Sequence, residues 1–464
     1  MEAFVEEQRL KGKIPGLAVV VVEKDRIVYQ RGFGYADLKR RIPVTANTLF
    51  ELGSNTKAFT ALAILQLEKQ GRLRLDDDVR TYIPWLILTY QGKSQPVTLR
   101  QLLHHTSGIA SNTIARIPPS RANDALVRTV KTLAERPLHR MPGSAYEYAT
   151  INYDVLGLVL ETVTKKPYED YIQQFILTPI GMDASMVGQP AQSVGMASGY
   201  KIGLTRAIAY TPPVYRGNTP AGYLISNAND IAKWLNVQLG TAPGRPIDPR
   251  LIAASHIPDK SVKPFAANST YAYGWSIEQK NGRAFVLHAG ENPTFSSYII
   301  MQPEQGIGIA VMANMRTTAT TAIGEGLMAL WQGWPADTNH FDPYQKLDQF
   351  VTVVWMVMTG TGIVLLALLL KLVRNLAGKR KQRRWASRSG KRVLLLILHI
   401  ILAATGLTGV IALPQLLLGG LPWSFILVWA PTSITLSVYT CLAVMAVYFG
   451  WGMLLIMTKK SQAR

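Results

Sequence analysis

The chain divides into two parts by the pattern of its apolar residues. The first 345 residues alternate short apolar runs with polar turns, whereas long uncharged apolar runs dominate from about residue 350 onward. A helix needs about 20 apolar residues to cross the hydrocarbon core of a bilayer. The runs at about 350–370, 393–413 and 433–457 meet that length, and a cluster of helix breakers separates the last two: Pro414, Gly419, Gly420, Pro422 and Pro431. We therefore predict a membrane domain of three helices over 346–464, in preference to a buried helical domain, which would show polar faces.

The first part, 1–345, predicts an α+β domain. Apolar runs at 17–22 and 26–31 flank a polar turn, which is typical of a β-hairpin. Helical spacing is strongest over 56–71, which ends at a glycine. The remaining strands and helices are predicted at 271–278, 283–288, 296–302 and 306–312, and at 153–163, 168–175 and 322–331. We expect the hairpin and the last strands to pair in one antiparallel sheet, with a mostly helical lobe inserted between them.

Charge is distributed unevenly between the two parts. The 464 residues include 49 Lys or Arg and 29 Asp or Glu, a formal charge of +20, yet residues 349–464 hold thirteen basic and no acidic residues. Ten of the thirteen lie in the predicted loop 371–392, and three follow the third helix. Basic loops stay in the cytoplasm, so we expect this loop and the C-terminus to be cytoplasmic. Binding of anionic lipid or nucleic acid by the loop is the alternative, but the +7 of the first part gives no reason to expect a nucleic-acid partner.

This topology places the first part on the extracytoplasmic face of a bacterial cytoplasmic membrane, with the lipid bilayer as a partner. The segment Met1–Glu7 is acidic and lacks the apolar core of a signal peptide, so we expect a signal peptide upstream of this sequence. The single cysteine, Cys441, excludes an intramolecular disulfide. The sequence contains no His-Glu-x-x-His motif and no Cys/His cluster, so we predict no metal and no cofactor.

A candidate nucleophile lies at the start of the strongest helix. Ser54 and Lys57 are three residues apart and therefore share one helical face. A neutral lysine can take the serine proton, and the free N–H at a helix N-terminus faces developing negative charge. The same Ser-x-x-Lys spacing recurs at Ser198 and Lys201, where flanking loop residues predict a structural role.

The surroundings of Ser54 carry more information than the pair itself. The stretch 48–63 resembles the active-site segment of the class C β-lactamase and penicillin-binding serine hydrolase family. The resemblance continues, in family order, through further segments and covers nearly all of 10–335: 71–79, 102–108, 142–143, 152–157 and 288–290. It implies a β-lactamase-like, two-lobed serine hydrolase domain, which agrees with the sheet and helical insert predicted above.

The resemblance assigns three motifs to this sequence. Ser54 and Lys57 match the nucleophile and its lysine, and Tyr148 matches a tyrosine that acts in proton transfer; a depressed phenol pKa would suit this role. Without the family frame, Tyr148 would be read as a packing aromatic residue. Aligning the second motif puts Thr150 where the family has asparagine, which makes antibiotic hydrolysis a poorer expectation.

The third motif matches His288-Ala-Gly290. The resemblance implies that Gly290 lets a substrate backbone approach and that the N–H of Glu291 completes an oxyanion hole with that of Ser54. Asn292 is the candidate for contacting a substrate amide, with a turn residue before a proline as the alternative. The adjacent histidines of the 102–108 segment look like bases but are predicted to be structural: His104 and His105.

The combination of a domain of this family with three C-terminal helices resembles the membrane-anchored N-acyl-D-asparagine prodrug-maturation peptidases, of the colibactin-activating type. The resemblance implies a small acyl-peptide substrate, with contacts from Thr150 and Asn292 to its D-asparagine amide. It also makes an exporter of the prodrug a candidate partner. Two alternatives remain: a cell-wall D-alanyl carboxypeptidase or D-Ala esterase, and a β-lactam sensor that signals through its helices.

Overall fold

The computed structural model describes residues 1–134, 136–188, 194–377, 383–385, 389–417 and 419–460. The chain forms two compact units, one built from Met1–Lys201 and Ala207–Asp342, the other from Ile202–Arg206 and Pro343–Arg464. The first unit carries the three sequence motifs, and the second carries the long apolar runs.

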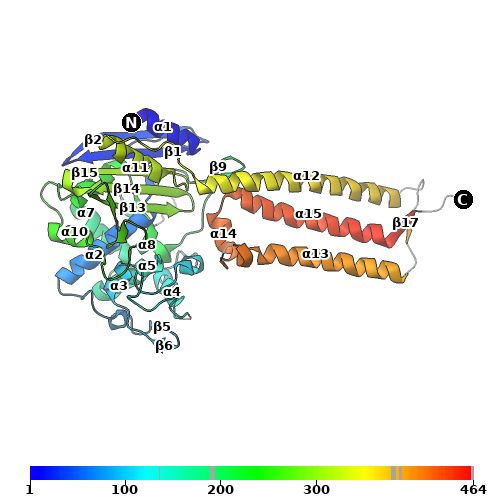
Figure 1. Ribbon diagram of the computed structural model, residues 1–464, viewed down its shortest axis with the longest axis horizontal. Helices are drawn as coiled ribbons and strands as arrows, with labels where there is room; N and C mark the ends of the chain where they lie inside the picture. The colour runs from blue at the N-terminus through cyan, green and yellow to red at the C-terminus, as the bar shows by residue number, and fades with distance from the viewer. Residues whose placement is uncertain (135, 189–193, 378–382, 386–388, 418, 461–464) are drawn as a thin grey trace. The chain divides into compact units, whose positions relative to one another are not determined.

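An antiparallel sheet of eight strands forms one layer of the first unit (Figure 1), in the order β11-β12-β13-β14-β15-β1-β2-β3. The strands are β1 (Gly16–Glu23), β2 (Arg26–Asp37), β3 (Ile42–Pro43), β11 (Ser269–Tyr271), β12 (Ser276–Lys280), β13 (Arg283–Asn292), β14 (Phe295–Gln302) and β15 (Ile307–Ala313). The first strand pairs with the last, with Leu17 opposite Ala313. This confirms the predicted sheet, in which the N-terminal hairpin joins the C-terminal strands.

Helices cover both faces of the sheet. On one face α11 (Ala319–Trp331) packs so closely on β14 that a Cβ at Gly324 would meet the ring of Tyr298. On the other face α9 (Ala228–Gln238) packs on β15, where Leu235 lies against Gly308. Residues 298 and 308 point to opposite faces in the β14–β15 register, so the sheet is buried on both sides. Helix α1 (Glu2–Lys11) lies beside α11 (Figure 1).

The helical lobe is inserted between β3 and β11, as predicted. At its centre α2 (Thr56–Lys69) is buried nearly all round, and Phe59 stacks on Trp234 with ring centroids 3.7 Å apart. The other helices of the lobe are α3 (Leu99–Leu103), α4 (Ala125–Lys131), α5 (Ile151–Thr164), α6 (Tyr168–Ile172), α7 (Thr178–Ile180), α8 (Thr219–Gly222) and α10 (Pro249–Ser255). The short strands between β3 and β11 in the sequence are β4 (Phe50–Glu51), β5 (Thr89–Tyr90), β6 (Lys93–Ser94), β7 (Met186–Val187), β8 (Tyr200–Gly203), β9 (Arg206–Ala209) and β10 (Leu224–Ser226).

One of the predicted strands is in fact divided between two strands of the structure. The run 271–278 divides into the end of β11 and the start of β12, because Gly274 adopts a left-handed conformation with φ +79°. A Cβ at this glycine would lie 2.6 Å from the backbone nitrogen of Ala58. The break therefore lets the chain pass close to α2, and only glycine fits there.

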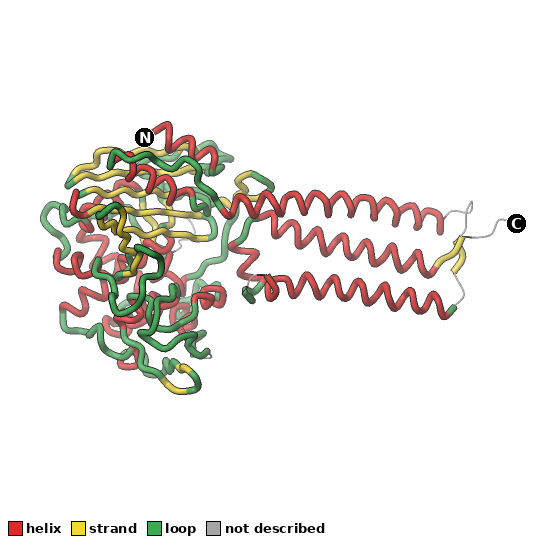
Figure 2. The backbone as a smooth tube through the Cα atoms, viewed as in Figure 1, coloured by secondary structure: helices red, strands yellow, loops and turns green. Residues whose placement is uncertain are grey.

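The second unit contains three helices long and apolar enough to cross a membrane (Figure 2): α12 (Pro343–Ala377), α13 (Gly390–Leu417) and α15 (Thr432–Met457). They are longer than predicted, and Pro414 lies inside α13 rather than ending it. A short helix, α14 (Trp423–Trp429), and two strands, β16 (Arg383–Trp385) and β17 (Thr458–Lys460), were not predicted. Much of the predicted basic loop, at 378–382 and 386–388, and the tail 461–464 with Arg464 lie outside the described residues.

Candidate active site

Ser54 lies on a single 3₁₀ turn, η1 (Gly53–Asn55), that leads directly into α2. Gly53 has φ +54°, and a Cβ on it would lie 2.5 Å from the backbone nitrogen of Glu291. The left-handed glycine therefore allows the nucleophile turn to lie directly against β13. Lys57 follows in the first turn of α2, and its Nζ lies 3.0 Å from the Ser54 Oγ atom.

The Lys57 side chain is fully buried and held by three oxygens. Its Nζ donates to Ser54 Oγ at 3.0 Å, to Thr150 Oγ1 at 3.0 Å and to the Ala221 carbonyl oxygen at 2.8 Å. Burial lowers the pKa of Lys57 to about 7, against an opposing effect of Asp154. At neutral pH a large fraction of this lysine is therefore uncharged and able to accept the Ser54 proton.

Tyr148 lies beside Lys57, but its pKa is raised and not lowered as expected. Its ring centroid is 5.1 Å from Lys57 Nζ, and its buried hydroxyl has no hydrogen-bond partner in the described part of the chain. Burial raises the pKa of Tyr148, and the nearby Ser54 hydroxyl lowers it by less. The expected depressed pKa is therefore wrong, because desolvation of the phenolate outweighs its neighbours. In this geometry Lys57 is the base and Tyr148 a neutral acid.

Thr150 immediately precedes α5 and is buried. The sequence placed this hydroxyl beside a substrate amide, but in the structure it accepts the hydrogen bond from Lys57. The replacement of the family's asparagine thus changes how the lysine is held. A contact with substrate would have to be made by the same hydroxyl.

The end of β13 extends past its neighbour β12, beside the nucleophile. Strand β12 pairs with β13 only as far as Leu287, so residues 288–292 extend beyond it and face η1. The two-residue turn Pro293–Thr294 makes Asn292 and Phe295 the first pair of the β13–β14 ladder. Because N–H directions alternate along such a ladder, the N–H of Glu291 points away from β14 and toward η1. The predicted oxyanion hole from the Glu291 and Ser54 N–H groups fits this arrangement.

Gly290 allows a close contact within the protein that the sequence did not predict. A Cβ there would collide with the carbonyl oxygen of Leu52 and lie 2.6 Å from Ser297 Oγ. The chain itself therefore makes a close approach here, between β13 and the segment before Ser54, and the approach of a substrate backbone stays a prediction.

The side chain of Asn292 is also hydrogen-bonded within the protein. Its buried side-chain amide donates to Glu51 Oε2 at 2.6 Å and to the Gly222 carbonyl at 2.9 Å. Both amide hydrogens are thus engaged with β4 and α8. The proposed donor role of Asn292 toward a substrate amide does not fit this geometry; Asn292 positions the end of β13.

His288 is buried and neutral. Its Nε2 is 3.0 Å from the Tyr271 hydroxyl and its Nδ1 is 2.6 Å from the Ala289 carbonyl. A carbonyl only accepts, so Nδ1 carries the proton and Tyr271 donates to Nε2. Burial lowers the pKa of His288 to about 3, with a smaller effect of Lys57. The imidazole is therefore a fixed wall of the site, and sequence reasoning did not identify its partner Tyr271.

The paired histidines have structural roles, as the sequence predicted. His105 Nδ1 accepts from the Asn152 side chain at 2.9 Å, and its ring packs 4.3 Å from that of Tyr148. His104 Nδ1 contacts the Tyr271 carbonyl at 3.1 Å. Burial lowers the pKa of both histidines, so neither is charged at neutral pH. The other Ser-x-x-Lys serine, Ser198, donates to Asp37 at 2.9 Å.

The main residue that the sequence reasoning missed is Asp154, in the first turn of α5. It is fully buried, and the Asn218 amide nitrogen, turned toward it, lies 2.9 and 3.2 Å from its two carboxyl oxygens. A signal was available, because Asp154 is the only charged residue in the mostly apolar run 151–160.

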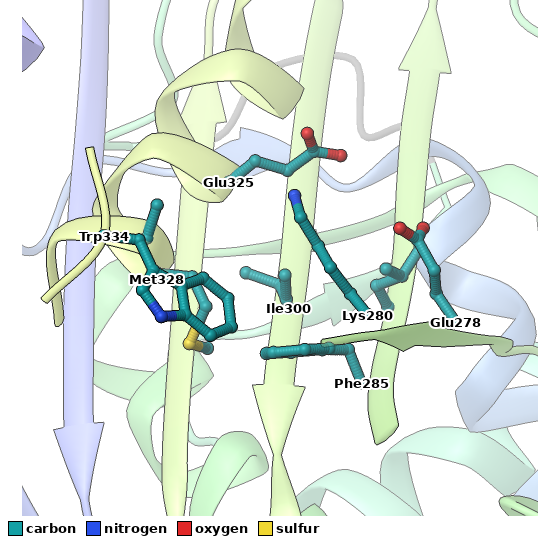
Figure 3. A pocket seen from close by; sticks show the side chains of 9 residues that line it. Glu278, Lys280, Phe285, Ile300, Glu325, Met328 and Trp334 are labelled. Carbon is teal, nitrogen blue, oxygen red and sulfur yellow. The ribbon is translucent and has the colours of Figure 1, made fainter. Parts of the chain in front are cut away.

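A separate hollow between α11 and β12–β14 is distinct from this site (Figure 3). It is lined by Glu278, Lys280, Phe285, Leu287, Ile300, Glu325, Met328, Ala329 and Trp334. Its volume is about 20 Å³, which holds about one water molecule. Among the described residues, no group of three or more His, Cys, Asp or Glu side chains is placed to hold a metal ion.

A serine paired with a buried lysine at a helix start, beside the end of β13 that directs the N–H of Glu291 toward it, defines a serine hydrolase. Residues 1–329 match the family model described as Beta-lactamase, and the chain belongs to that family. Protein flp from Staphylococcus aureus (strain N315) is 31% identical over 449 residues, 95% of this chain and 87% of its own.

Two further similarities concern the first unit. The unguisins hydrolase ungD' of Aspergillus campestris is 29% identical over 324 residues, 65% of this chain and 58% of its own length. The octameric penicillin-binding protein homologue from Pyrococcus abyssi superimposes with a TM-score of 0.65 at 28% identity, covering 75% of this chain and 80% of that one. The fold and hydrolase class predicted from the motifs are thus confirmed.

Proposed function

We propose that this protein is a membrane-anchored serine peptidase that removes an N-acyl-D-amino-acid cap, N-acyl-D-asparagine, from an exported peptide. The observation that carries the proposal is the joint presence of a Ser54–Lys57–Tyr148 site and three helices able to cross a membrane. An acylated peptide partitions into the bilayer, so anchoring would concentrate enzyme and substrate in one layer. The similarity to a protein named Unguisins hydrolase supports a hydrolytic reaction.

The reaction would follow from the geometry. Neutral Lys57 takes the proton of the Ser54 hydroxyl, 3.0 Å away, while Ser54 Oγ bonds to the D-amino-acid carbonyl carbon. The N–H groups of Ser54 and Glu291 stabilise the resulting oxyanion. Tyr148 protonates the leaving nitrogen as its bond to the carbonyl carbon breaks, and regains a proton from Lys57. Water then hydrolyses the acyl-enzyme ester, releasing the N-acyl-D-amino acid.

A D-Ala specificity is the second candidate, favoured by the engagement of both Asn292 amide hydrogens within the protein. With those donors engaged, a small methyl side chain needs no polar partner, whereas D-asparagine needs another one. The variant Asn292→Leu does not separate the two, because it breaks the bonds to Glu51 and Gly222 whichever substrate is used. Substrate comparison is therefore the decisive measurement.

The test is a mass-spectrometric assay of the full chain in detergent with two substrates, an N-acyl-D-asparaginyl peptide and an acyl-D-Ala-D-Ala peptide. We expect faster release of N-acyl-D-asparagine, and none from Ser54→Ala. Faster cleavage of the D-Ala-D-Ala substrate would favour the second candidate. Turnover by Ser54→Ala equal to that of the unmodified chain would exclude Ser54 as the nucleophile.

A further inference from the structure

A buried carboxyl group lies behind the catalytic lysine. Asp154 is fully buried on α5, four residues after Thr150, which binds Lys57. Burial raises the pKa of Asp154, and Lys57 and the Ala221 N–H lower it by less. Burying a carboxyl group is costly unless it is hydrogen-bonded or paired with a charge. Its retention beside the reacting groups therefore requires a reason beyond packing.

The single-turn helix α8 connects Asp154 to the site. At its start, the Asn218 amide faces both Asp154 carboxyl oxygens. Towards its end, consecutive carbonyls are each bound by a different side chain: Pro220 by Thr60, Ala221 by Lys57 and Gly222 by Asn292. Anything that moves the start of α8 would therefore move the acceptor that orients Lys57.

We propose that Asp154 is a positioning residue for Lys57, which anchors α8 through Asn218 and provides the buried negative charge that balances the lysine when it takes the Ser54 proton. Sequence and geometry both support this role, since Thr150, immediately before α5, binds Lys57, and Asp154 follows four residues later in the first turn of α5. The inference rests on the serine hydrolase activity and is independent of the identity of the substrate.

The charge balance around the pair supports the assignment. Besides burial, Asp154 is the group that shifts the pKa of Lys57, and it raises that pKa. The other titratable groups that face Lys57 are uncharged at neutral pH: Tyr148, Tyr153, His105 and His288. Those that face Asp154 from other elements are likewise neutral phenols, Tyr168 and Tyr223. Asp154 is thus placed to set the pH at which Lys57 becomes a base.

The experiment measures the rate at which a fluorophosphonate labels Ser54, by intact mass of the full chain, between pH 5 and 9. Labelling needs an activated serine but no particular substrate. For the unmodified chain we expect the rate to fall below about pH 7, as Lys57 becomes protonated. In Asp154→Asn we expect this fall to move about one pH unit lower, because the carboxylate that raises the pKa of Lys57 has been removed. The rate at pH 6, relative to its plateau, then increases about fivefold.

A matched control is Asp230→Asn, which changes a second buried aspartate that binds Ser185 and the backbone of α7–β7. In Asp230→Asn, the pH at which the labelling rate is half of its plateau should be the same as in the unmodified chain. If Asp154→Asn lowers the plateau but leaves the midpoint unchanged, Asp154 is only structural and the proposal fails. If Asp154→Asn does not fold, Asn218→Leu removes the donors that favour the carboxylate; the same downward movement is expected, and its absence overturns the proposal. Failure of the D-asparagine assay would leave this labelling result unaffected.

Discussion

Replacing the buried lysine by methionine should make stability depend on pH in a specific way. The folded state of the unmodified chain holds Lys57 with a pKa of about 7, whereas the unfolded chain has the ordinary 10.5. A depressed pKa means that the contribution to stability is complete only above 10.5 and is lost as pH falls through 7. Lys57 therefore destabilises the fold by about 4 kcal/mol at pH 7 and about 2 kcal/mol at pH 9.

The methionine variant removes this penalty but also loses three hydrogen bonds, to Ser54, Thr150 and Ala221. At about 1 kcal/mol each, their loss offsets about 3 kcal/mol. Lys57→Met should thus be about 1 kcal/mol more stable than the unmodified chain at pH 7, and about 1 kcal/mol less stable at pH 9.

The assay is thermal unfolding of the full chain in detergent, followed by fluorescence of the buried Trp234 and Trp275. The difference in melting temperature between variant and unmodified chain should change by about 3 °C between pH 7 and 9. Lys93→Met, at an exposed position, is the control and should show the same difference at both pH values. A pH-independent difference for Lys57→Met would refute the argument that burial keeps this lysine neutral.

Three further substitutions test the geometry. Thr150→Val keeps the shape but removes an acceptor of Lys57, so fluorophosphonate labelling of Ser54 should slow about tenfold; an unchanged rate would show that the other acceptors suffice. Tyr271→Phe leaves His288 Nε2 buried without its donor, and should lower stability by about 1–2 kcal/mol in thermal unfolding, with an unchanged melting temperature as the contrary result. Gly290→Ala places a methyl group against Leu52 and Ser297 and should displace the end of β13, which carries the Glu291 N–H. Peptide hydrolysis should then fall at least about 100-fold. Near-normal hydrolysis would mean that β13 tolerates the methyl group.

Much of the fold could be predicted because its signals are local. Short apolar runs separated by polar turns located the strands, and the motifs around Ser54, Tyr148 and His288 implied the family. What could not be predicted depends on contacts between distant segments. The break at Gly274 arises from its approach to Ala58, and the use of both Asn292 amide hydrogens arises from Glu51 and Gly222. The pKa of Tyr148 was misjudged for the same reason, since only the packed structure reveals how completely its hydroxyl is buried.

The placement of β1 beside β15 has a consequence for biosynthesis. Ser54 and Lys57 emerge early, but the donor of Glu291 and the strand that anchors it are made more than 230 residues later, and the sheet closes only when residue 313 pairs with residue 17. A nascent or truncated chain that stops short of β13 carries the nucleophile without the proposed oxyanion donor of Glu291, and we expect it to be inactive. The same separation suits a split enzyme, in which two fragments divided within the helical lobe would regain hydrolysis only on reassembly.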